Sequence, residues 1–570
     1  MASTTVIPVS KIRRARPVPK GRAVDPVARE EVARVLEGAP REREYLIENL
    51  HRVQDQFGSL SAARLNALAE AMKLSQAEVY EVATFYHHFD IVKEGEKAPA
   101  KVTVRVCETL SCAMAGAEDL IAKLPSLVGP DVRVLRAPCI GRCAEAPAVC
   151  VGHNAFGHAH AEEVASCVKD GKTHAPKTHP HGYADYRSQG GYRTWAECVG
   201  GKRDVESVIK TMEDAGLRGL GGAGFPAGRK WKIVRAEPGP RLMAVNIDEG
   251  EPGTFKDRHY LERDPHRFIE GMLIAAWAVG IEDLFVYLRD EYHACREMLE
   301  AELALLRADP PAVAWGRAGD RTALPRIHMR RGAGAYICGE ESAMIESIEG
   351  RKGMPRLRPP YVAQVGLFGR PTLEHNMETL FWVRDLIEQG PEWFSKHGRN
   401  GRKGLRSFSV SGRVKKPGVH LAPAGITVKE LIAEYCGGMM EGHELYAYLP
   451  GGASGGILPA SMGDIALDFD TLQPFGCFIG SAAVIILSQH DKARDAAVNL
   501  MRFFEHESCG QCTPCRVGTA KAAHLMEAPK WDQALLEDLN VAMADASICG
   551  LGQAAPNPIR CVVKHFPNEI

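Results

Sequence analysis

Three cysteines spaced two residues apart give the strongest chemical signal in this sequence. Cys509, Cys512 and Cys515 form a C-x2-C-x2-C run, and Cys549 follows one helical stretch later in a second loop. Three closely spaced thiolates with a remote fourth are typical of the ligands of a [4Fe–4S] cluster. Tetrahedral zinc is the alternative, but zinc modules usually pair their ligands two and two. The spacing therefore favours iron–sulfur chemistry.

A second cysteine set lies near the N-terminus, as Cys107-x4-Cys112 and Cys139-x3-Cys143. Two such pairs could serve zinc, a redox disulfide or a [2Fe–2S] cluster, and the spacing alone does not decide between them. The remaining cysteines show no pairing, and we expect most of them to be buried small apolar residues. These are Cys150, Cys167, Cys198, Cys295, Cys338, Cys436, Cys477 and Cys561.

A glycine cluster, Gly219-Leu-Gly221-Gly-Ala-Gly224, formally satisfies the dinucleotide fingerprint G-x-G-x-x-G. That fingerprint requires a preceding strand, whereas the residues before it are helical in pattern and end at Gly216. Independently of that fingerprint, consecutive glycines let the backbone approach an anionic or planar ligand closely, and Lys230 can supply positive charge.

Two further segments place polar groups where a ligand could bind. Residues 242–245 are strand-like and are followed by Asn246, Asp248, Glu249 and Glu251, which could also be only a solvated turn. Ligands of α/β sheets bind beyond the carboxyl ends of strands. The segment 332–341 puts Gly339 and two carboxylates, Glu340 and Glu341, at the start of a helix, which could also merely complement the helix dipole.

The elements that must position these groups fall into blocks. Residues 28–90 read as helices of a small bundle, with Ser75 as a helix cap. Residues 101–107 and 132–135 read as strands flanking a helix at 117–127, so cysteines stand at strand ends of a small α/β domain. Residues 171–193 lack periodicity and look like a linker.

The second half of the chain alternates between helices and strands. Strand-like runs at 242–245, 284–288 and 327–329 alternate with helices at 268–279 and 294–306, which predicts an α/β domain. Residues 405–490 change to short β-like runs with one helix at 428–435. The pattern is helical again from residue 492.

Length, composition and net charge limit the class of protein. With 570 residues, 45% hydrophobic and 25% charged, the chain is ordinary globular protein of several domains. A net charge of −1 gives no bulk attraction to nucleic acid. No apolar stretch reaches the about 20 residues that span a bilayer, so we expect no membrane insertion.

The first 23 residues are basic but have no apolar signal core, so we expect a disordered tail; a transit peptide is the minor alternative. Sixteen cysteines without a secretion signal indicate a reducing, cytoplasmic compartment.

Together the motifs resemble one family. GLRGLGGAGFPAGRKW, NIDEGEPGTFKDR, GAYICGEESAMIESIEG, HNMETL, ESCGQCTPCR and SICGLG occur in the order found in the NADH-oxidising flavoprotein subunit of respiratory complex I and in related diaphorases. Upstream, EVATFYHHF and the two cysteine pairs resemble the thioredoxin-like [2Fe–2S] subunit that accompanies that flavoprotein. The chain looks like a fusion of the two, most similar to the β subunit of NAD-dependent molybdenum- or tungsten-containing formate dehydrogenases.

The resemblance implies a multidomain α/β fold. Its expected parts are a disordered tail (1–24), a helical bundle (25–97), a thioredoxin-like [2Fe–2S] domain (98–172), a linker (173–200), a Rossmann-like FMN/NADH domain (201–400), a β-grasp domain of the soluble-ligand-binding type (401–490) and a helical [4Fe–4S] domain (491–570).

The resemblance also implies the site residues. FMN should be held by Gly219, Gly221, Gly222, Gly224, Lys230, Asn246, Asp248, Gly339, Glu340, Asn376 and Thr379. NADH should meet Phe225, Glu251, Glu341, Arg358 and Tyr361, with Glu251 and Glu341 orienting the nicotinamide. One [4Fe–4S] cluster should take Cys509, Cys512, Cys515 and Cys549, and one [2Fe–2S] cluster Cys107, Cys112, Cys139 and Cys143. Family members often have Lys at Arg358, Phe at Tyr361 and Asn at His375.

The implied function is that of a diaphorase subunit. Nicotinamide exchanges two electrons as hydride and clusters carry one, so FMN is needed between them and no acid–base side chain need act. The implied partner is a catalytic α subunit carrying a molybdenum or tungsten pterin and further iron–sulfur clusters. Alternatives are the diaphorase subunit of an NAD-reducing hydrogenase, a complex I-type NADH dehydrogenase subunit and, from another class, a zinc-stabilised scaffold.

Overall fold

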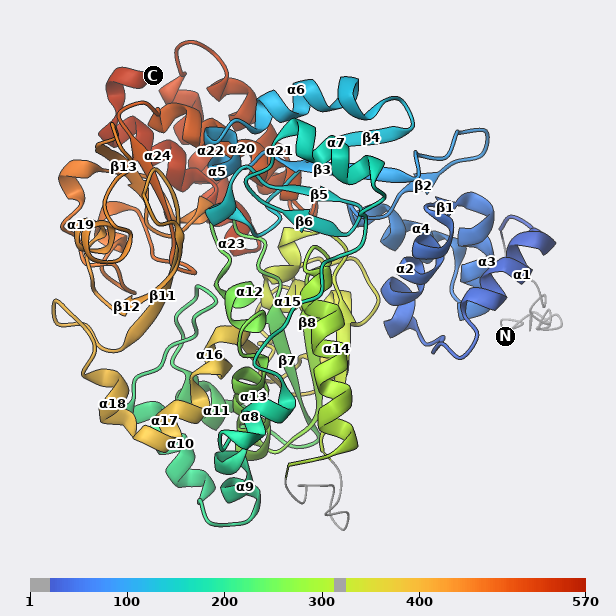
Figure 1. Ribbon diagram of the computed structural model, residues 1–570, viewed down its shortest axis with the longest axis horizontal. Helices are drawn as coiled ribbons and strands as arrows, with labels where there is room; N and C mark the ends of the chain where they lie inside the picture. The colour runs from blue at the N-terminus through green and yellow to red at the C-terminus, as the bar shows by residue number, and fades with distance from the viewer. Residues whose placement is uncertain (1–20, 312–323) are drawn as a thin grey trace, which may run out of the picture. The chain divides into compact units, whose positions relative to one another are not determined.

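The computed structural model describes residues 21–311 and 324–570, so most of the predicted N-terminal tail lies outside the described residues. Two compact units are present (Figure 1). One comprises residues 21–85 and 89–98, and the other comprises Tyr86–His88 together with the described residues from 99 onward. Within the described ranges, no helix is both long enough and apolar enough to cross a membrane.

The smaller unit is a helical bundle. It contains α1 (Pro26–Val35), α2 (Leu46–Phe57), α3 (Ala62–Met72) and α4 (Gln76–Phe85). Ser75 and Glu78 cap α4 reciprocally, because Ser75 Oγ accepts from the Glu78 N–H and the Glu78 carboxylate accepts from the Ser75 N–H. The predicted helices and the predicted cap are confirmed.

The next domain is built on the sheet β4-β3-β5-β6, whose edge strand β6 comprises Asn154–Phe156. Strand β3 (Val102–Cys107) runs parallel to β4 (Val132–Ala137) and antiparallel to β5 (Val149–Val151). Helices α6 (Ala117–Val128) and α7 (Ala161–Lys169) contribute Leu120, Leu124 and Val164 to its core. Cys107 pairs in register with Ala137, so both cysteine loops begin at neighbouring strand ends.

The stretch predicted to be a linker differs from that expectation over residues 183–199. It forms α8 (Tyr183–Ser188) and α9 (Arg193–Val199). Tyr186 and Trp195 are buried in the core of the following domain, and the Tyr186 hydroxyl donates to Glu270 Oε2 at 2.6 Å. Aromatic packing against a distant helix, which leaves no period in the sequence, orders this segment.

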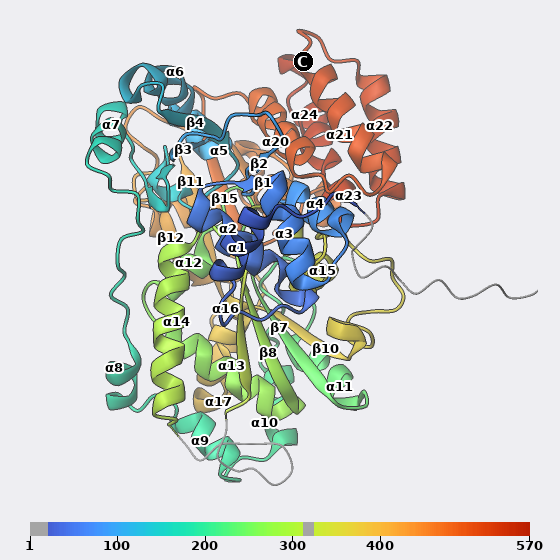
Figure 2. The same ribbon diagram turned by 90° about the vertical axis from the view of Figure 1, so that its right-hand side faces the viewer.

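The central domain is a parallel sheet in the order β10-β7-β8-β9. Its strands are β7 (Arg241–Ile247), β8 (Ile281–Leu288), β9 (Arg326–Arg331) and β10 (Thr372–Asn376). Helix α13 (Pro265–Val279) is buried along almost its whole length, and α14 (His293–Ala308) lies beside the sheet (Figure 2). The first strand, β7, has the last strand on one side and the second on the other, so the strand order reverses between β7 and β10.

The last two domains show the predicted change from short β strands to helices. Five strands form a mixed sheet in the order β12-β11-β15-β13-β14, with β15 at its centre. They are β11 (Leu405–Gly412), β12 (Gly418–Pro423), β13 (Leu445–Leu449), β14 (Leu458–Pro459) and β15 (Ala483–Ser488). Its helical turn runs from Val428 to Tyr435, as predicted. The C-terminal part is helical, with α20 (Ala493–Glu507), α21 (Thr513–Met526), α22 (Gln533–Ala546), α23 (Gly550–Ala554) and α24 (Pro556–His565). The multidomain α/β fold class is confirmed, while the domain boundaries stay a prediction.

Candidate functional site

The glycine loop folds back on itself between two helices. It follows α10 (Val205–Asp214) and precedes α11 (Ala227–Ala236), so no strand leads into it, as the sequence indicated. The Gly219 N–H donates to Phe225 O at 2.8 Å, and the Gly224 N–H donates to Gly219 O at 3.2 Å. The Leu220 N–H donates to Thr379 Oγ1 at 2.9 Å, which fixes the loop to α16 (Met377–Phe381).

The loop meets the carboxyl ends of two strands at the point where the strand order reverses. Asn246 on β7 and Asn376 on β10 are register partners. A Cβ added to Gly221 would lie 3.0 Å from Asn376 Cβ. The Asn246 amide donates to Gly339 O at 2.9 Å, and a Cβ on Gly339 would lie 3.2 Å from Asp248 O. The reversal point of an open α/β sheet is where such folds bind ligands.

Asp248 supplies the test of whether a flavin fits here. Its Oδ2 is inaccessible to solvent and has no hydrogen-bond partner among the described residues. Burial raises the pKa of this carboxyl well above its usual range. Buried polar atoms normally have a partner, so this oxygen calls for a donor that the chain does not supply. A ligand with a ring N–H, bordered by glycine backbone, meets that need, and FMN is such a ligand.

Other predicted flavin contacts are already engaged within the protein. The Lys230 ammonium donates to Glu374 O at 3.1 Å. The Asn376 amide donates to Asp257 Oδ2 at 2.7 Å and accepts from the buried Lys256 ammonium at 3.1 Å. Lys256 and Asp257, both in the quoted TFKDR motif, were not singled out from the sequence, although they hold Asn376 in place.

The residues predicted to meet NADH comprise two carboxylates and exposed aromatic rings. Glu251 accepts from the Ser454 N–H at 2.8 Å and from the Tyr336 hydroxyl. Phe225 is 38% exposed and Tyr361 is 56% exposed, so both rings are open to a stacking partner. Glu341 instead forms an ion pair of 2.7 Å with Arg358, a pair that a bound nucleotide would have to accommodate.

The four C-terminal cysteines line one hollow. Cys509, Cys512, Cys515 and Cys549 surround it together with apolar side chains such as Ile337. Cys512 and Cys549 are the residues that precede the first turns of α21 and α23. Helix N-termini stabilise negative charge, and four converging thiols are the donor set of a cubane cluster. The three closely spaced cysteines and the remote fourth therefore lie together in the folded chain.

The four N-terminal cysteines are buried together. Cys139 Sγ lies 3.3 Å from Cys143 Sγ and accepts from the Gly141 N–H at 3.4 Å. Cys107 is near enough to both Cys112 and Cys139 for their thiols to raise its pKa. The two pairs thus form one group of four, which fits a [2Fe–2S] cluster.

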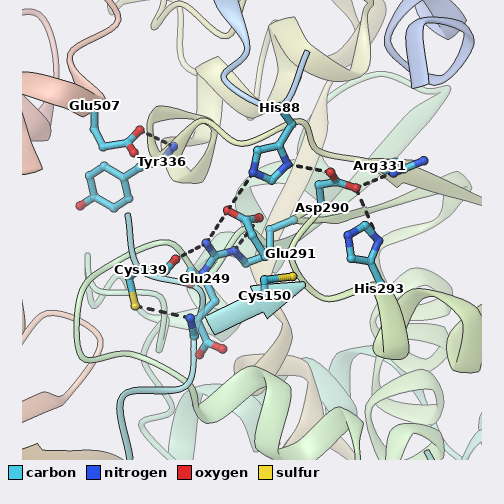
Figure 3. A network of polar contacts seen from close by, with 12 residues as sticks. His88, Cys139, Cys150, Glu249, Asp290, Glu291, His293, Arg331, Tyr336 and Glu507 are labelled. Atoms are coloured by element: carbon cyan, nitrogen blue, oxygen red, sulfur yellow. Dashed lines mark hydrogen bonds and ion pairs between the residues drawn. The ribbon is translucent and has the colours of Figure 1, made fainter. Parts of the chain in front are cut away.

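A buried arginine, which the sequence did not reveal, joins this cysteine group to the sheet. Arg289 is 4% exposed and donates to Cys139 O at 2.6 Å and to Glu249 O. It pairs with Glu291 at 2.7 Å, and Figure 3 shows Cys139, Glu249 and Glu291 within one polar network. Arg289 lies just past β8 in the charged run Arg289-Asp290-Glu291, which looks in the sequence like an ordinary solvated turn.

Replacing Arg289 with Gln should lower the midpoint potential of a cluster held by Cys139. A positive charge several ångströms away favours the reduced cluster by about 1–2 kcal/mol at an effective dielectric constant near 20. The shift, tens of millivolts, is measured by redox titration followed by electron paramagnetic resonance. Arg267→Gln, which removes an arginine paired with Asp385, should leave that potential in place. Equal potentials in the wild-type protein and Arg289→Gln would contradict the effect.

Glu249 is a second buried charge in the same network. It is 5% exposed and accepts from the Asp257 N–H at 2.8 Å and from the Tyr292 hydroxyl at 2.9 Å. Burial, with the nearby Asp257, raises its pKa from 4.5 to about 7.

This shift predicts a stability that falls as the pH rises. Below pH 4.5 Glu249 is protonated in both states; between 4.5 and 7 the unfolded chain releases the proton while the folded chain keeps it. The free energy of unfolding should lose about 3 kcal/mol across this window. Glu249→Gln should flatten that part of the curve of thermal midpoint against pH. The same slope in both proteins would contradict the assignment.

Comparisons with known proteins agree with this geometry. Family models match as the Nuo51 FMN-binding domain over residues 212–385 and the thioredoxin-like [2Fe-2S] ferredoxin over 32–172. Others match as the NADH-ubiquinone oxidoreductase-F iron-sulfur binding region over 495–570 and the SLBB domain over 407–458. The predicted cofactors, FMN, NAD(H), one [2Fe–2S] and one [4Fe–4S] cluster, are confirmed.

The similar proteins cover different shares of this chain. The NADH-quinone oxidoreductase F-subunit 2 of Rhizobium meliloti (strain 1021) is 39% identical over 68% of this chain and 93% of its own length. The NADH-quinone oxidoreductase F-subunit of Aquifex aeolicus (strain VF5) is 40% identical over 69% of this chain and 92% of its own. A chain of the NAD+-reducing [NiFe]-hydrogenase in the H2-reduced state is 31% identical, with a TM-score of 0.78, over 93% of this chain and 92% of that one.

Proposed function

We propose a function from the premise that this chain belongs to the family of NADH-quinone oxidoreductase F-subunits. It is accordingly an oxidoreductase subunit that binds NADH and FMN and carries iron–sulfur domains. The finer proposal is that it acts as a diaphorase, exchanging hydride between NAD(H) and FMN and single electrons with a partner subunit. Its main support is the convergence of the glycine loop with the ends of β7 and β10 around the unpartnered Asp248 oxygen.

FMN, when bound, supplies the change from paired to single electrons. The chain's own residues would bind the flavin and the nucleotide and orient them. The glycines admit the flavin closely, Lys230 offsets its negative charge, and the Asp248 carboxylate accepts its hydrogen bond. We propose for FMN the whole predicted set: Gly219, Gly221, Gly222, Gly224, Lys230, Asn246, Asp248, Gly339, Glu340, Asn376 and Thr379.

NADH would be positioned above that cradle by the residues around Glu251. The Tyr336 hydroxyl and the Ser454 N–H fix the Glu251 carboxylate in one orientation, so that it and Glu341 can orient the nicotinamide. Phe225 and Tyr361 would stack on the nucleotide, with Arg358 nearby. No side chain need take or give a proton in this scheme.

The two cysteine sets would hold the clusters that carry single electrons. We propose Cys509, Cys512, Cys515 and Cys549 for [4Fe–4S] and Cys107, Cys112, Cys139 and Cys143 for [2Fe–2S]. We propose that the partner is a molybdenum or tungsten pterin subunit that oxidises formate, in the cytoplasm. The resemblance of the fused chain to the β subunit of formate dehydrogenases supports this partner, although the fusion itself is shared with the second candidate.

A second candidate is the diaphorase subunit of an NAD-reducing hydrogenase. The specific observation in its favour is the likeness over 93% of the chain, which takes in the N-terminal module. A complex I-type subunit has less support, because the F-subunits match only about two thirds of the chain.

An anaerobic preparation of this chain tests the diaphorase proposal. We expect brown protein with flavin and iron absorbance that reduces a dye with NADH; a colourless protein would support a zinc scaffold instead. Assaying the native complex for NAD+ reduction with formate and with hydrogen then separates the two partners. Activity with hydrogen alone would reject the formate proposal and leave the diaphorase proposal intact.

A further inference from the structure

Three side chains outside the flavin and cysteine sites converge on one point. His87, His506 and Glu507 each offer one possible ligand atom, and these three atoms lie within 4.8 Å of one another. The two imidazole rings are 4.2 Å apart between centroids. His87 belongs to the segment Tyr86–His88, and the other two residues end α20, so the chain brings together residues more than 400 positions apart.

The His87 backbone is held by its neighbours. The Tyr86 side chain is buried and its hydroxyl donates to Arg351 O at 2.8 Å. The His88 N–H donates to Ala333 O at 3.1 Å, and its ring nitrogen lies 2.7 Å from Asp290 (Figure 3). With both neighbours fixed, the exposed His87 ring can swing about its side-chain bonds without moving the backbone.

Glu507 is preorganised as a ligand. It is 4% exposed, and its Oε2 accepts from the Tyr336 N–H at 3.0 Å (Figure 3). Its other oxygen, Oε1, lies 3.2 Å from His506 Nδ1. Such an outer hydrogen bond, which orients a carboxylate and leaves one oxygen toward the site, is typical of metal ligands.

Carboxylates surround the site. Glu507 is one of the three residues, and Glu108 and Glu505 lie close enough for their charges to act on His506. Nearby negative charge favours the binding of a cation.

We propose that His87, His506 and Glu507 form a binding site for a divalent transition-metal ion of the Zn²⁺ class. Two imidazoles and one carboxylate with an open fourth position are a common zinc ligand set, whereas Mg²⁺ and Ca²⁺ prefer oxygen alone. With metal–ligand bonds of about 2.0–2.1 Å, tetrahedral ligands lie about 3.3 Å apart, close to the separation of His506 Nδ1 and Glu507 Oε1. Only the exposed ring of His87 would have to turn for all three ligands to reach one ion.

The ion would link the Tyr86–His88 segment to the end of α20, two residues before Cys509. It would therefore bind the folded protein preferentially and raise its thermal midpoint by mass action. This proposal uses no residue of the flavin or cysteine sites and does not depend on the electron-transfer function.

Zinc binding to the full chain with its cofactors tests the site. Protein freed of loosely held metal is dialysed anaerobically against ⁶⁵Zn²⁺, and zinc is counted per FMN while iron is monitored to verify that the clusters remain. We expect one tight zinc per chain, no competition by Mg²⁺, and affinity at least about 100-fold weaker in His506→Gln and in His87→Gln.

His524→Gln is the matched control. His524 is an exposed histidine beside Glu527 at 3.9 Å, but it is not part of the three-residue group. This variant should bind zinc like the wild-type protein. Zinc binding of equal affinity in His506→Gln and His87→Gln, or no tight zinc in the wild-type protein, would overturn the proposal. Both histidines are exposed, and retained FMN and iron would show that each variant is folded.

Discussion

Replacing Cys512 with alanine is expected to stop electron delivery to a partner while leaving FMN bound. Cys512 lines the hollow shared by the four C-terminal cysteines and stands directly before α21. Without its thiolate, a cubane loses one of four protein ligands, and the remaining three do not close the site. The glycine loop and the strand ends that would hold the flavin share no residue with that hollow.

The measurements distinguish electron transfer at the flavin from electron transfer through the cluster to the partner. Iron should fall by the four atoms of one cluster, FMN content should stay, and NADH-dependent reduction of a dye that accepts electrons at the flavin should persist. NAD+ reduction by the reconstituted complex should fall to the background rate. Cys436→Ala is the control, because this buried cysteine lies in the β-rich domain, outside both cysteine sets. Undiminished delivery by the Cys512 variant would remove this residue from the pathway.

Features that depend on local spacing could be predicted from the sequence. The three-plus-one cysteines, and the strands that carry Cys107 and Asn246 near their carboxyl ends, are set by short patterns. The structure brings the four cysteines together and places Cys107 and Asn246 beside neighbouring strands. The helix before the glycine loop is also visible in the sequence, and it distinguishes this loop from a dinucleotide fingerprint, which follows a strand.

Features that depend on distant partners could not be predicted. Tyr186 and Trp195 look like part of an aperiodic linker until Glu270, more than 70 positions later, accepts their hydrogen bonds. Arg289 becomes a bridge only because Cys139 O lies beside it in the fold. His87 and His506 meet for the same reason. Pairing across such separations requires the tertiary structure, which no local period encodes.

Asp248→Ala should have opposite effects on the protein with and without FMN. In the flavin-free protein the change removes a buried carboxyl oxygen that has no partner, so the thermal midpoint should rise or stay the same. In the loaded protein it leaves the flavin's ring N–H without an acceptor, which costs about 1–3 kcal/mol. FMN affinity, measured by fluorescence titration of the flavin-free protein, should weaken by about 10- to 100-fold.

Asp385→Ala should show the reverse pattern and so isolates the cause. Asp385 is 7% exposed, but its oxygen already accepts from Arg267 at 2.6 Å, and it is not among the predicted flavin contacts. Its loss leaves an arginine unpaired, which should lower the thermal midpoint without changing FMN affinity. If both variants lost stability and neither lost FMN, Asp248 would be a structural carboxylate like Asp385. Its unpartnered oxygen would then bind a water rather than a flavin, and only the glycine loop would mark the flavin's position.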